Sequence, residues 1–204
     1  MGWYETHVFN ALMDAELDNA ALHEERAALL AGARGDILEL GIGTGLNLPH
    51  YPPAVARITA LGPDLVLDRR AIERARKRGI AVDYVPGDAR SLPFDAGRFD
   101  TVVATLVLCT IPEPARAVAE AKRVLAPGGS LLVLEHVARP KGWVRVFQRA
   151  FDPVNRVLSC GCSLLRDTKT TLGEAGFTEL ALEERVARGL PFPSAWVIRG
   201  QARR

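Results

Sequence analysis

Long apolar runs and an excess of charge are missing from this chain of 204 residues. No apolar run approaches the roughly 20 residues that a transmembrane helix needs, and we expect no signal peptide at Met1. The net charge of +2 is too small to indicate a nucleic-acid partner, since the basic residues are dispersed among acids as on solvated helix faces. We therefore expect no transmembrane segment and no nucleic acid, and peripheral membrane contact stays open.

Cysteine is scarce, with Cys109, Cys160 and Cys162 the three in the chain. They do not make a paired disulfide framework, so a reducing compartment is expected and with it a cytoplasmic protein. Cys160 and Cys162 lack a second ligand pair at the spacing of a zinc site. The sequence therefore predicts no metal. It gives no indication of the oligomeric state.

The most informative segment is residues 36–48, where a short apolar run stops at three alternate glycines. Residues 37–40 read as a strand, Gly41, Gly43 and Gly45 as a tight turn, and the amphipathic segment that follows as the start of a helix. Glycine permits positive φ and lets a ligand approach without a Cβ in the way, while a helix start offers free N–H groups. This turn predicts a nucleotide-like ligand, although a glycine turn without a ligand is the structural alternative.

The spacing of the turn narrows the choice of ligand. A dinucleotide fingerprint needs a small residue three positions after Gly43, where this chain has Leu46. The Lys-Ser/Thr pair of a phosphate loop is also absent. The segment from Glu39 to Gly45 instead resembles the acidic-x-Gly-x-Gly-x-Gly motif of class I methyltransferases that depend on S-adenosylmethionine (SAM).

Strands and helices alternate from residue 36 to residue 135. We predict further strands at residues 57–61, 80–85, 99–105 and 130–136. Asp64 is the expected N-cap of a helix that ends at Gly79, Pro49 and the prolines after it end the helix that follows the glycine turn, and residues 127–129 form a turn before the fifth strand. This alternation predicts an α/β fold with a doubly wound, mostly parallel, Rossmann-like sheet.

The two ends of the chain depart from that alternation. Residues 1–35 carry helical spacing and are expected to form a helical cover, with Tyr4 over the site as one reading and core packing as the other. Residues 138–176 are expected to form a helical insertion on the substrate side, with helices at 143–158 and 168–175. Strands at 177–182 and 194–201 would add an antiparallel edge hairpin. The whole is then a single seven-stranded domain, residues 1–204.

Further motifs along the chain extend the resemblance. Gly87-Asp88-Ala89, the run from Phe99 to Cys109 and the run from Arg123 to Gly129 resemble type-11 methyltransferases. Later residues are similar to the branch of methyltransferase-like thiol S-methyltransferases and their bacterial relatives, namely Glu135-His136-Val137, Trp143, Phe147-Gln148, Asp152-Pro153, and the run from Gly161 to Thr168. The resemblance implies SAM as cofactor, S-adenosylhomocysteine (SAH) as product, and a small, apolar acceptor such as a thiol or a hydroxyl compound.

The resemblance also implies where the cofactor lies, because ligands of doubly wound sheets bind at the carboxyl ends of the central strands. Asp88 would take the adenine amino group, although it could only cap its own turn. Backbone carbonyls of residues 104–106 would take the methionine ammonium. The predicted cofactor-binding residues are Glu39, Gly41, Gly43, Gly45, Asn47, Gly62, Pro63, Asp64, Asp88, Ala89, Thr105 and Leu106.

One departure from the family pattern bears on function. The acidic residue expected at the end of the second strand, which binds the ribose hydroxyls, is replaced by Gly62. A hydrogen bond to a charged group is worth about 1.5–3 kcal/mol, so cofactor binding is expected to be roughly tenfold to hundredfold weaker, unless Asp64 compensates. A SAM-binding protein with weak or lost catalysis is therefore an alternative. A nicotinamide-dependent reductase is a further one, which Leu46 opposes.

His136, directly after the fifth strand, is the predicted catalytic residue. A thiol acceptor has a pKa of about 8.5 and needs modest help to lose its proton. An imidazole at this position could take that proton. The alternative is a structural histidine held by hydrogen bonds, and for Cys109 a buried small hydrophobe is the preferred interpretation.

Overall fold

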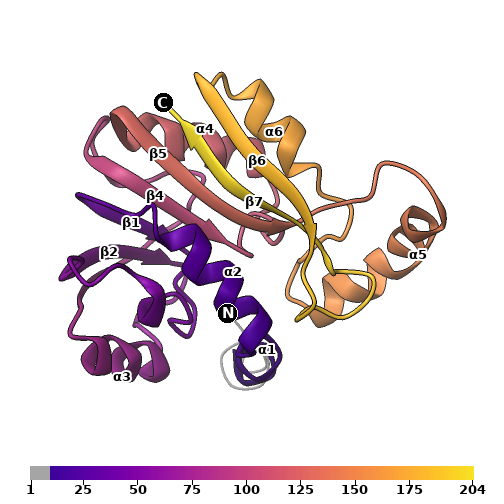
Figure 1. The fold of residues 1–204 in the computed structure, drawn as a ribbon, viewed down its shortest axis with the longest axis horizontal. Coiled ribbons are helices and arrows are strands. Elements are labelled where there is room, and N and C mark those ends of the chain that lie inside the picture. Colours follow the sequence, from indigo (N-terminus) through magenta and orange to yellow (C-terminus); the bar gives the residue numbers. More distant parts are fainter. Residues whose placement is uncertain (1–9) are drawn as a thin grey trace.

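The computed structural model describes residues 10–204, so the predictions for Tyr4 lie outside the described residues. Its centre is a seven-stranded sheet in the order β3-β2-β1-β4-β5-β7-β6, in which β1 to β5 pair in parallel and β6 and β7 are antiparallel (Figure 1). This confirms the doubly wound sheet with an antiparallel edge. The strands are β1 (Ile37–Leu40), β2 (Arg57–Gly62), β3 (Ala81–Pro86), β4 (Phe99–Thr105), β5 (Leu125–His136), β6 (Glu179–Val186) and β7 (Trp196–Arg203).

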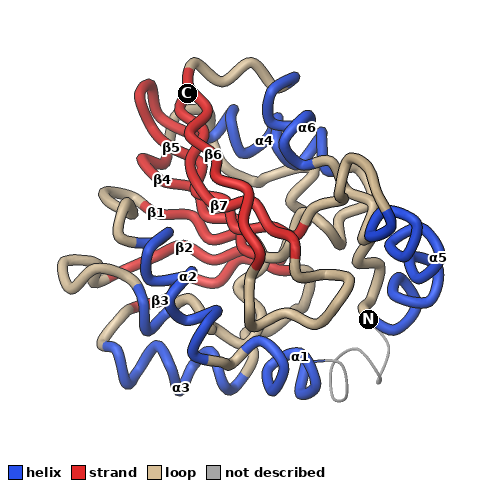
Figure 2. The backbone as a smooth tube through the Cα atoms, turned by 45° about the vertical axis from the view of Figure 1, so that its right-hand side comes forward, coloured by secondary structure: helices blue, strands red, loops and turns tan. Residues whose placement is uncertain are grey.

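Helices cover both faces of the sheet (Figure 2). They are α1 (Asn10–Leu17), α2 (Ala20–Leu30), α3 (Arg69–Arg78), α4 (Pro114–Val124), α5 (Trp143–Leu158) and α6 (Thr168–Glu174). Alternate residues of β4 serve the two layers: Val102 and Ala104 join the core beneath α4 and α6, and Val103 joins the core beneath α2 and α3. A strand buried on both faces is apolar almost throughout, which is why β4 was predicted to the residue.

The glycine turn does not lead into an α-helix, so that part of the prediction is wrong. Residues 41–47 form successive turns, and only a 3₁₀ turn, η2 (Leu48–His50), follows. Pro49 lies in its first turn and Pro52 and Pro53 follow, so the chain has neither the N–H groups nor the length for a longer helix. The backbone N–H groups of this turn are therefore not organised by a helix.

The predicted cap of α3 is also wrong. Asp68, not Asp64, is the N-cap, and its carboxylate accepts a hydrogen bond of 2.8 Å from the Arg70 N–H. β2 runs to Gly62, and the loop of residues 63–68 is needed to reach the face on which α3 packs. The predicted end at Gly79 is confirmed, with a left-handed φ of +73°. Asp64 is thus left free of the capping role.

Strand boundaries differ near the antiparallel edge. β5 already begins at Leu125, because Phe99 of β4 pairs with Leu125 and Thr101 pairs with Ser130. The predicted turn at residues 127–129 lies inside this strand as an irregularity of the pairing, with a left-handed φ of +76° at Gly128. β6 and β7 each start two residues later than predicted, since pairing of Ser130 with Arg203 sets the register of the edge. The sequence pattern predicted which segments form strands, and pairing with the neighbouring strands decides where each strand begins and ends.

Helix α5 lies at one side of the molecule, on the right in Figure 1. The side chains that it buries are mostly polar: Gln148 donates to the carbonyls of Val137 and Pro193, and Asp152 accepts from Ser163 Oγ at 2.9 Å. Its apolar side chains instead face outward, where Trp143, Val146, Phe147, Phe151, Val154, Val157 and Leu158 are exposed. We call these seven residues the α5 apolar face.

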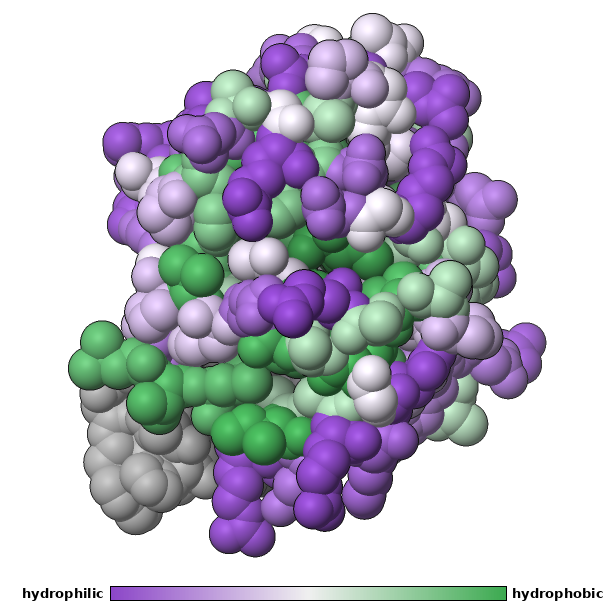
Figure 3. Space-filling model, turned by 90° about the vertical axis from the view of Figure 1, so that its left-hand side faces the viewer, coloured by the Kyte–Doolittle hydropathy of each residue, from purple (hydrophilic) through white to green (hydrophobic). Residues whose placement is uncertain are grey.

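The surface on the side of the molecule opposite α5 is more hydrophilic than the α5 apolar face. Seen from there, hydrophilic residues cover much of the surface and hydrophobic residues gather in a band low on the view (Figure 3). None of the helices among residues 10–204 combines the length and the apolarity that crossing a bilayer requires.

Candidate functional site

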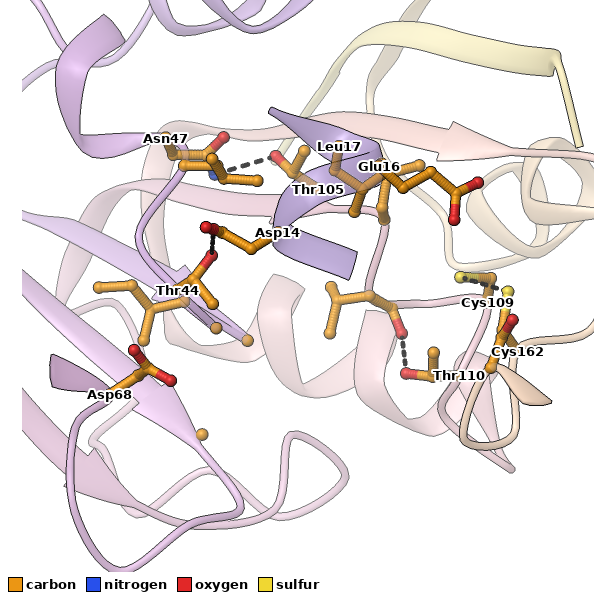
Figure 4. A pocket seen from close by; sticks show the side chains of 18 of the residues that line it. Asp14, Glu16, Leu17, Thr44, Asn47, Asp68, Thr105, Cys109, Thr110 and Cys162 are labelled. Atoms are coloured by element: carbon orange, nitrogen blue, oxygen red, sulfur yellow. Dashed lines mark hydrogen bonds between the residues drawn. The ribbon is translucent and has the colours of Figure 1, made fainter. Parts of the chain in front are cut away.

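A cavity of about 380 Å³ opens where β1, β2, β4 and β5 end. Figure 4 shows it from close by, with Thr44, Asp14 and Asp68 toward one end and Cys109 and Cys162 toward the other. Its walls come from the glycine turn, the loop after β2, helix α1, the segment after β4, and residues of α5 and the β6–β7 loop. The predicted site residues that line it are Glu39, Gly41, Gly43, Asn47, Gly62, Pro63, Asp64, Thr105, Leu106 and His136.

The glycines of the turn have different surroundings. All have positive φ. A Cβ on Gly43 would meet only the Gly41 carbonyl oxygen, at 3.9 Å, so this residue leaves backbone open to the cavity. A Cβ on Gly45 would lie 2.9 Å from Ala71 Cα, so Gly45 lets the turn pack against α3 and is not among the residues that line the cavity.

Glu39 holds the floor of the cavity together. Its buried carboxylate accepts hydrogen bonds from Asn47 Nδ2 and from the Tyr51 hydroxyl, each at 2.9 Å, and Asn47 also donates to Thr105 Oγ1 at 3.2 Å. Burial raises the pKa of Glu39 to about 7. This network joins β1, the segment after the glycine turn and the end of β4.

Arg26 of α2 completes the network, and sequence reasoning missed it. Its guanidinium donates to Asn47 Oδ1 at 2.7 Å, and burial lowers its pKa to about 10. The side chain is 4% exposed, lines the cavity, and its Nε is a buried donor without a partner. A buried, unpartnered donor beside a cavity favours an anionic ligand group. The spacing of apolar residues in α2 predicted only a helix that packs on the core. Nothing in the sequence distinguished Arg26 from the other charged residues of that helix.

Tyr84 of β3 fills the space beside Gly62. A Cβ on Gly62 would lie 2.7 Å from the Tyr84 hydroxyl oxygen, which donates a hydrogen bond to the Asp64 carbonyl. Gly62 and Tyr84 both line the cavity, together with Pro63 and Asp64. The glycine is therefore matched by a tyrosine on the neighbouring strand, a pairing visible only once the parallel register places residue 62 near residue 84.

Asp88 and Ala89 stand away from the cavity lining. The Asp88 carboxylate accepts from the Arg90 N–H at 2.8 Å and pairs with the Arg90 guanidinium at 2.7 Å. These hydrogen bonds from Arg90 lower the pKa of Asp88. Ala89 is buried in the core beneath α4. Asp88 thus makes the turn-capping contacts of the alternative interpretation.

The segment after β4 is held from below by a second buried carboxylate. Glu135 accepts hydrogen bonds from the N–H groups of Val107, Leu108 and Cys109, at 2.7 to 3.3 Å, and burial raises its pKa to about 7. Leu106 has a left-handed φ of +53°, which a leucine rarely adopts. Strained backbone of this kind is held in place only where the surrounding structure fixes it, as the Glu135 hydrogen bonds do here.

His136 lies at the far end of the cavity with two cysteines. Its Nε2 is 3.2 Å from Cys162 Sγ, and Cys162 donates a 3.6 Å hydrogen bond to Cys109 Sγ. Burial lowers the pKa of His136 to about 4, so its ring is neutral at pH 7 and a weak proton acceptor. Cys109 is buried as predicted, and its pKa is raised by the Cys162 hydrogen bond and by burial.

The strand order, the glycine turn after β1 and the cavity at the carboxyl ends of the parallel strands define the fold and binding side of a class I methyltransferase. The chain matches the family described as "Methyltransferase domain" over residues 38–133. It is also 38% identical to the human thiol S-methyltransferase TMT1B over 82% of this chain and 69% of that protein. The protein therefore belongs to the SAM-dependent methyltransferases.

A second curated relative is also similar in sequence, and a solved structure is similar in fold. A phosphatidylethanolamine N-methyltransferase of Cereibacter sphaeroides is 38% identical over 61% of this chain and 63% of its own. The crystal structure of Burkholderia thailandensis 1,6-didemethyltoxoflavin-N1-methyltransferase matches the fold with a TM-score of 0.68 at 19% identity, over 96% of this chain and 83% of that one. The chain spans about two thirds of the length of the curated relatives.

The buried carboxylate of Glu39 makes a testable contribution to stability. A folded pKa of about 7 against an unfolded value near 4.5 means that the folded state holds the proton more tightly, so this contribution is present below pH 4.5 and is lost as the pH rises through 7. Between pH 5 and pH 8, the free energy of unfolding should fall by about 2–3 kcal/mol more in the wild type than in Glu39→Gln.

Chemical denaturation at both pH values measures this difference. Glu73→Gln, which changes an exposed carboxylate on α3, is the matched control and should keep the wild-type pH dependence. Equal pH dependence in Glu39→Gln and the wild type would contradict the assignment.

Proposed function

We propose that this chain binds SAM in the cavity and transfers its methyl group to a small apolar acceptor, with a thiol as the favoured acceptor. The observation that carries this proposal is the continuity of one cavity from Gly43 in the glycine turn to His136 at the end of β5. The first end suits a nucleoside and amino acid, and the second end is lined by soft sulfur and imidazole groups. Cofactor and acceptor could therefore meet inside one space.

The described residues suggest a place for each part of the cofactor. The unpartnered Nε of Arg26 suits the methionine carboxylate, and the carbonyls at Thr105 and Leu106 suit its ammonium. The ribose hydroxyls would be taken by Asp64, which is free because Asp68 caps α3. Gly41, Gly43 and Pro63 would approach the cofactor through backbone.

Adenine recognition is the part of the site that needs a rearrangement. For Asp88 to accept the adenine amino group, its carboxylate must give up part of its pairing with Arg90. Asp88 is largely exposed, and exposed ion pairs are worth only about 0–1 kcal/mol. Giving up part of this pairing therefore costs little free energy. The adenine role of Asp88 stays a prediction.

Methyl transfer from a sulfonium is an in-line displacement in which the cofactor supplies the activated methyl group. The protein's contribution is to align the acceptor with the methyl carbon in a cavity that excludes water, and such orientation is worth up to about 7–11 kcal/mol. A base is needed only where the acceptor arrives protonated. Because burial lowers the pKa of His136 to about 4, its neutral ring suits the role of partner to the acceptor better than that of base.

An apolar acceptor is supported by the surface next to the cavity. Asn155 and Ser159, at the end of α5, line the cavity, and the α5 apolar face lies on the same helix. Aromatic side chains interleaved with arginines, as in residues 143–156, are typical of helices that lie at a membrane surface. We include peripheral membrane contact in the proposal, with the acceptor reaching the cavity from the lipid side. A cytoplasmic location stays a prediction.

The alternative is a protein of the same fold that binds SAM with weak or lost catalysis. It rests on Gly62, which leaves the ribose hydroxyls without the family's acidic partner. A nicotinamide-dependent reductase has less support, since Leu46 is buried where that fingerprint needs a small residue. The two experiments on cofactor binding below separate these alternatives from the proposal.

Ligand binding tests the cofactor assignment. A ligand at 100 times its dissociation constant stabilises the folded state by about 2.7 kcal/mol, so SAH should raise the melting temperature by roughly 5–10 °C. NADH and NADPH at the same concentration are the controls and should leave it unchanged. Differential scanning fluorimetry measures the shift, and no shift at millimolar SAH would contradict the proposal.

Restoring the ribose-binding acid tests whether Gly62 weakens the enzyme. In Gly62→Glu alone, the new side chain meets the Tyr84 hydroxyl, so we combine it with Tyr84→Phe, which removes the atom 2.7 Å away. The double variant should bind SAH about 10–100-fold more tightly than Tyr84→Phe alone, since a charged hydrogen bond is worth about 1.5–3 kcal/mol. Calorimetry measures the affinity, and methyl transfer to a panel of thiols should rise in parallel. Tighter binding without any transfer would support the non-catalytic alternative.

Membrane contact is tested with the α5 apolar face. The wild type should sediment with vesicles that contain anionic phospholipid, and Trp143→Glu with Phe151→Glu should abolish this, because charge at the interface opposes insertion of an apolar face. Val186→Glu, at an exposed valine of β6, is the control. Equal sedimentation of all three proteins would remove membrane contact from the proposal.

A further inference from the structure

Cys109, His136 and Cys162 come together at the acceptor end of the cavity, although they are distant in the sequence. One donor atom from each lies within 4.8 Å of the other two, and all three residues line the cavity. Figure 4 shows Cys109 and Cys162 side by side at the end remote from Asp68. From this cluster we infer that the protein binds a Zn²⁺ ion through Cys109 Sγ, His136 Nε2 and Cys162 Sγ, with a fourth coordination position open to the cavity.

The distances fit tetrahedral zinc without large movement. Zn–S bonds of about 2.3 Å and Zn–N bonds of about 2.0–2.1 Å in a tetrahedron place two sulfurs about 3.8 Å apart and a sulfur and a nitrogen about 3.6 Å apart. The observed separations are 3.6 Å between the two sulfurs and 3.2 Å between Cys162 Sγ and His136 Nε2. These two separations need to widen by a few tenths of an ångström, while Cys109 Sγ and the His136 ring nitrogen, which lie within 4.8 Å of each other, need to reach about 3.6 Å to hold the ion.

The backbone around each cysteine is held in place. Three N–H groups, ending with that of Cys109, bond to the Glu135 carboxylate, and the Cys109 carbonyl accepts from the Ser163 N–H and from Arg166 Nε. The Cys162 carbonyl accepts from Asn155 Nδ2 at 2.8 Å. Ligands that are fixed before the metal arrives lose little freedom on binding it.

Charge and ligand type select the ion. Two thiolates and one neutral imidazole balance Zn²⁺, so the occupied site carries no net charge from ion and ligands. Thiolate and imidazole are the donors that zinc takes, and a set of two cysteines and one histidine with an open position is the arrangement of catalytic rather than structural zinc. The sequence predicted no metal because Cys160 and Cys162 have no second ligand pair nearby in the chain. That prediction did not include ligands that the fold brings together from distant positions, as it does for Cys109, His136 and Cys162.

The open position gives the site a chemical use, and this step rests on the proposed function. A thiol that enters the cavity would bind zinc as a thiolate, its proton leaving to solvent, because a coordinated thiol is deprotonated at neutral pH. His136 would then be a ligand that holds the metal and not a base. The zinc would present a sulfur nucleophile at the end of the cavity where the acceptor must lie.

Metal binding by the full chain tests the site without any need for activity. Protein kept reduced with a phosphine and freed of metal by chelation should bind one Zn²⁺ in competition with a chromophoric chelator. Cys162→Ser should weaken binding by more than about a hundredfold, since even outer-shell partners of metal ligands contribute about 10–100-fold. Cys160→Ser, which changes the neighbouring cysteine outside the cluster, is the matched control and should bind as the wild type does.

Co²⁺ provides a readout in the unaltered protein. Bound at this site, it should show thiolate-to-cobalt charge-transfer absorption and the strong visible bands of four-coordinate cobalt. Equal zinc affinity of wild type and Cys162→Ser, or cobalt spectra without charge transfer, would overturn the site. The site would also be overturned if the reduced protein bound no zinc and Cys109 and Cys162 formed a disulfide. That result would assign the pair to redox chemistry.

A small apolar thiol separates this inference from the proposed function. In the absence of SAM, the thiol should change the visible bands of the bound cobalt by entering the open position. Unchanged bands would overturn the thiol role. Zinc binding by a protein that shows no SAH-induced thermal shift would instead contradict the proposed function and leave the metal site standing.

Discussion

The structure of the site depends on one buried carboxylate, that of Glu39 at the end of β1. A buried carboxylate needs hydrogen-bond partners, and Glu39 finds them in Asn47 and Tyr51, both beyond the glycine turn. Through Asn47 the network reaches Thr105 of β4 and Arg26 of α2. The acidic residue of the motif therefore secures the turn, which an α-helix does not support, to the sheet. The glycines can remain open to the cavity because the turn is fixed from behind.

Glu135 does the same for the acceptor end. It lies at the end of β5, two positions in the sheet from β1, and its carboxylate gathers three N–H groups of the segment after β4. The cavity thus extends between two buried carboxylates on parallel strands, each of which shapes the chain segment above it. The first segment suits the cofactor, and the second carries Cys109 toward His136 and Cys162. A strand end is well suited to this task because side chains of the last residues reach the loops while the strand itself stays fixed.

The helix α5 adds a different kind of constraint. Beside buried Val144, its inner side is held by hydrogen bonds of Gln148 and Asp152 to loop backbone. The Asp152 carboxylate accepts hydrogen bonds from Ser163 and Leu164, and Asn155 of the same helix donates to the Cys162 carbonyl, so α5 also positions the segment that brings Cys162 to the cavity. Because its apolar side chains are not needed for this attachment, they are available on the surface. One helix therefore connects the outer apolar face with the inner end of the cavity.

The sequence by itself determined the order of the elements, the parallel sheet with its antiparallel edge, the glycine turn and its acid, and the buried character of β4, because each of these is written in local periodicity and turn residues. Tertiary structure decided what lies beside what. The space beside Gly62, where the family has an acidic side chain, is filled by Tyr84, because the β2–β3 register brings the two residues together. Asp68 caps α3 because the loop after β2 must reach the far face. Arg26 enters the site because α2 packs beneath Asn47. Cys109, His136 and Cys162 meet for the same reason: contacts between residues distant along the chain are fixed by the packing of whole elements, and spacing along the sequence carries no record of them.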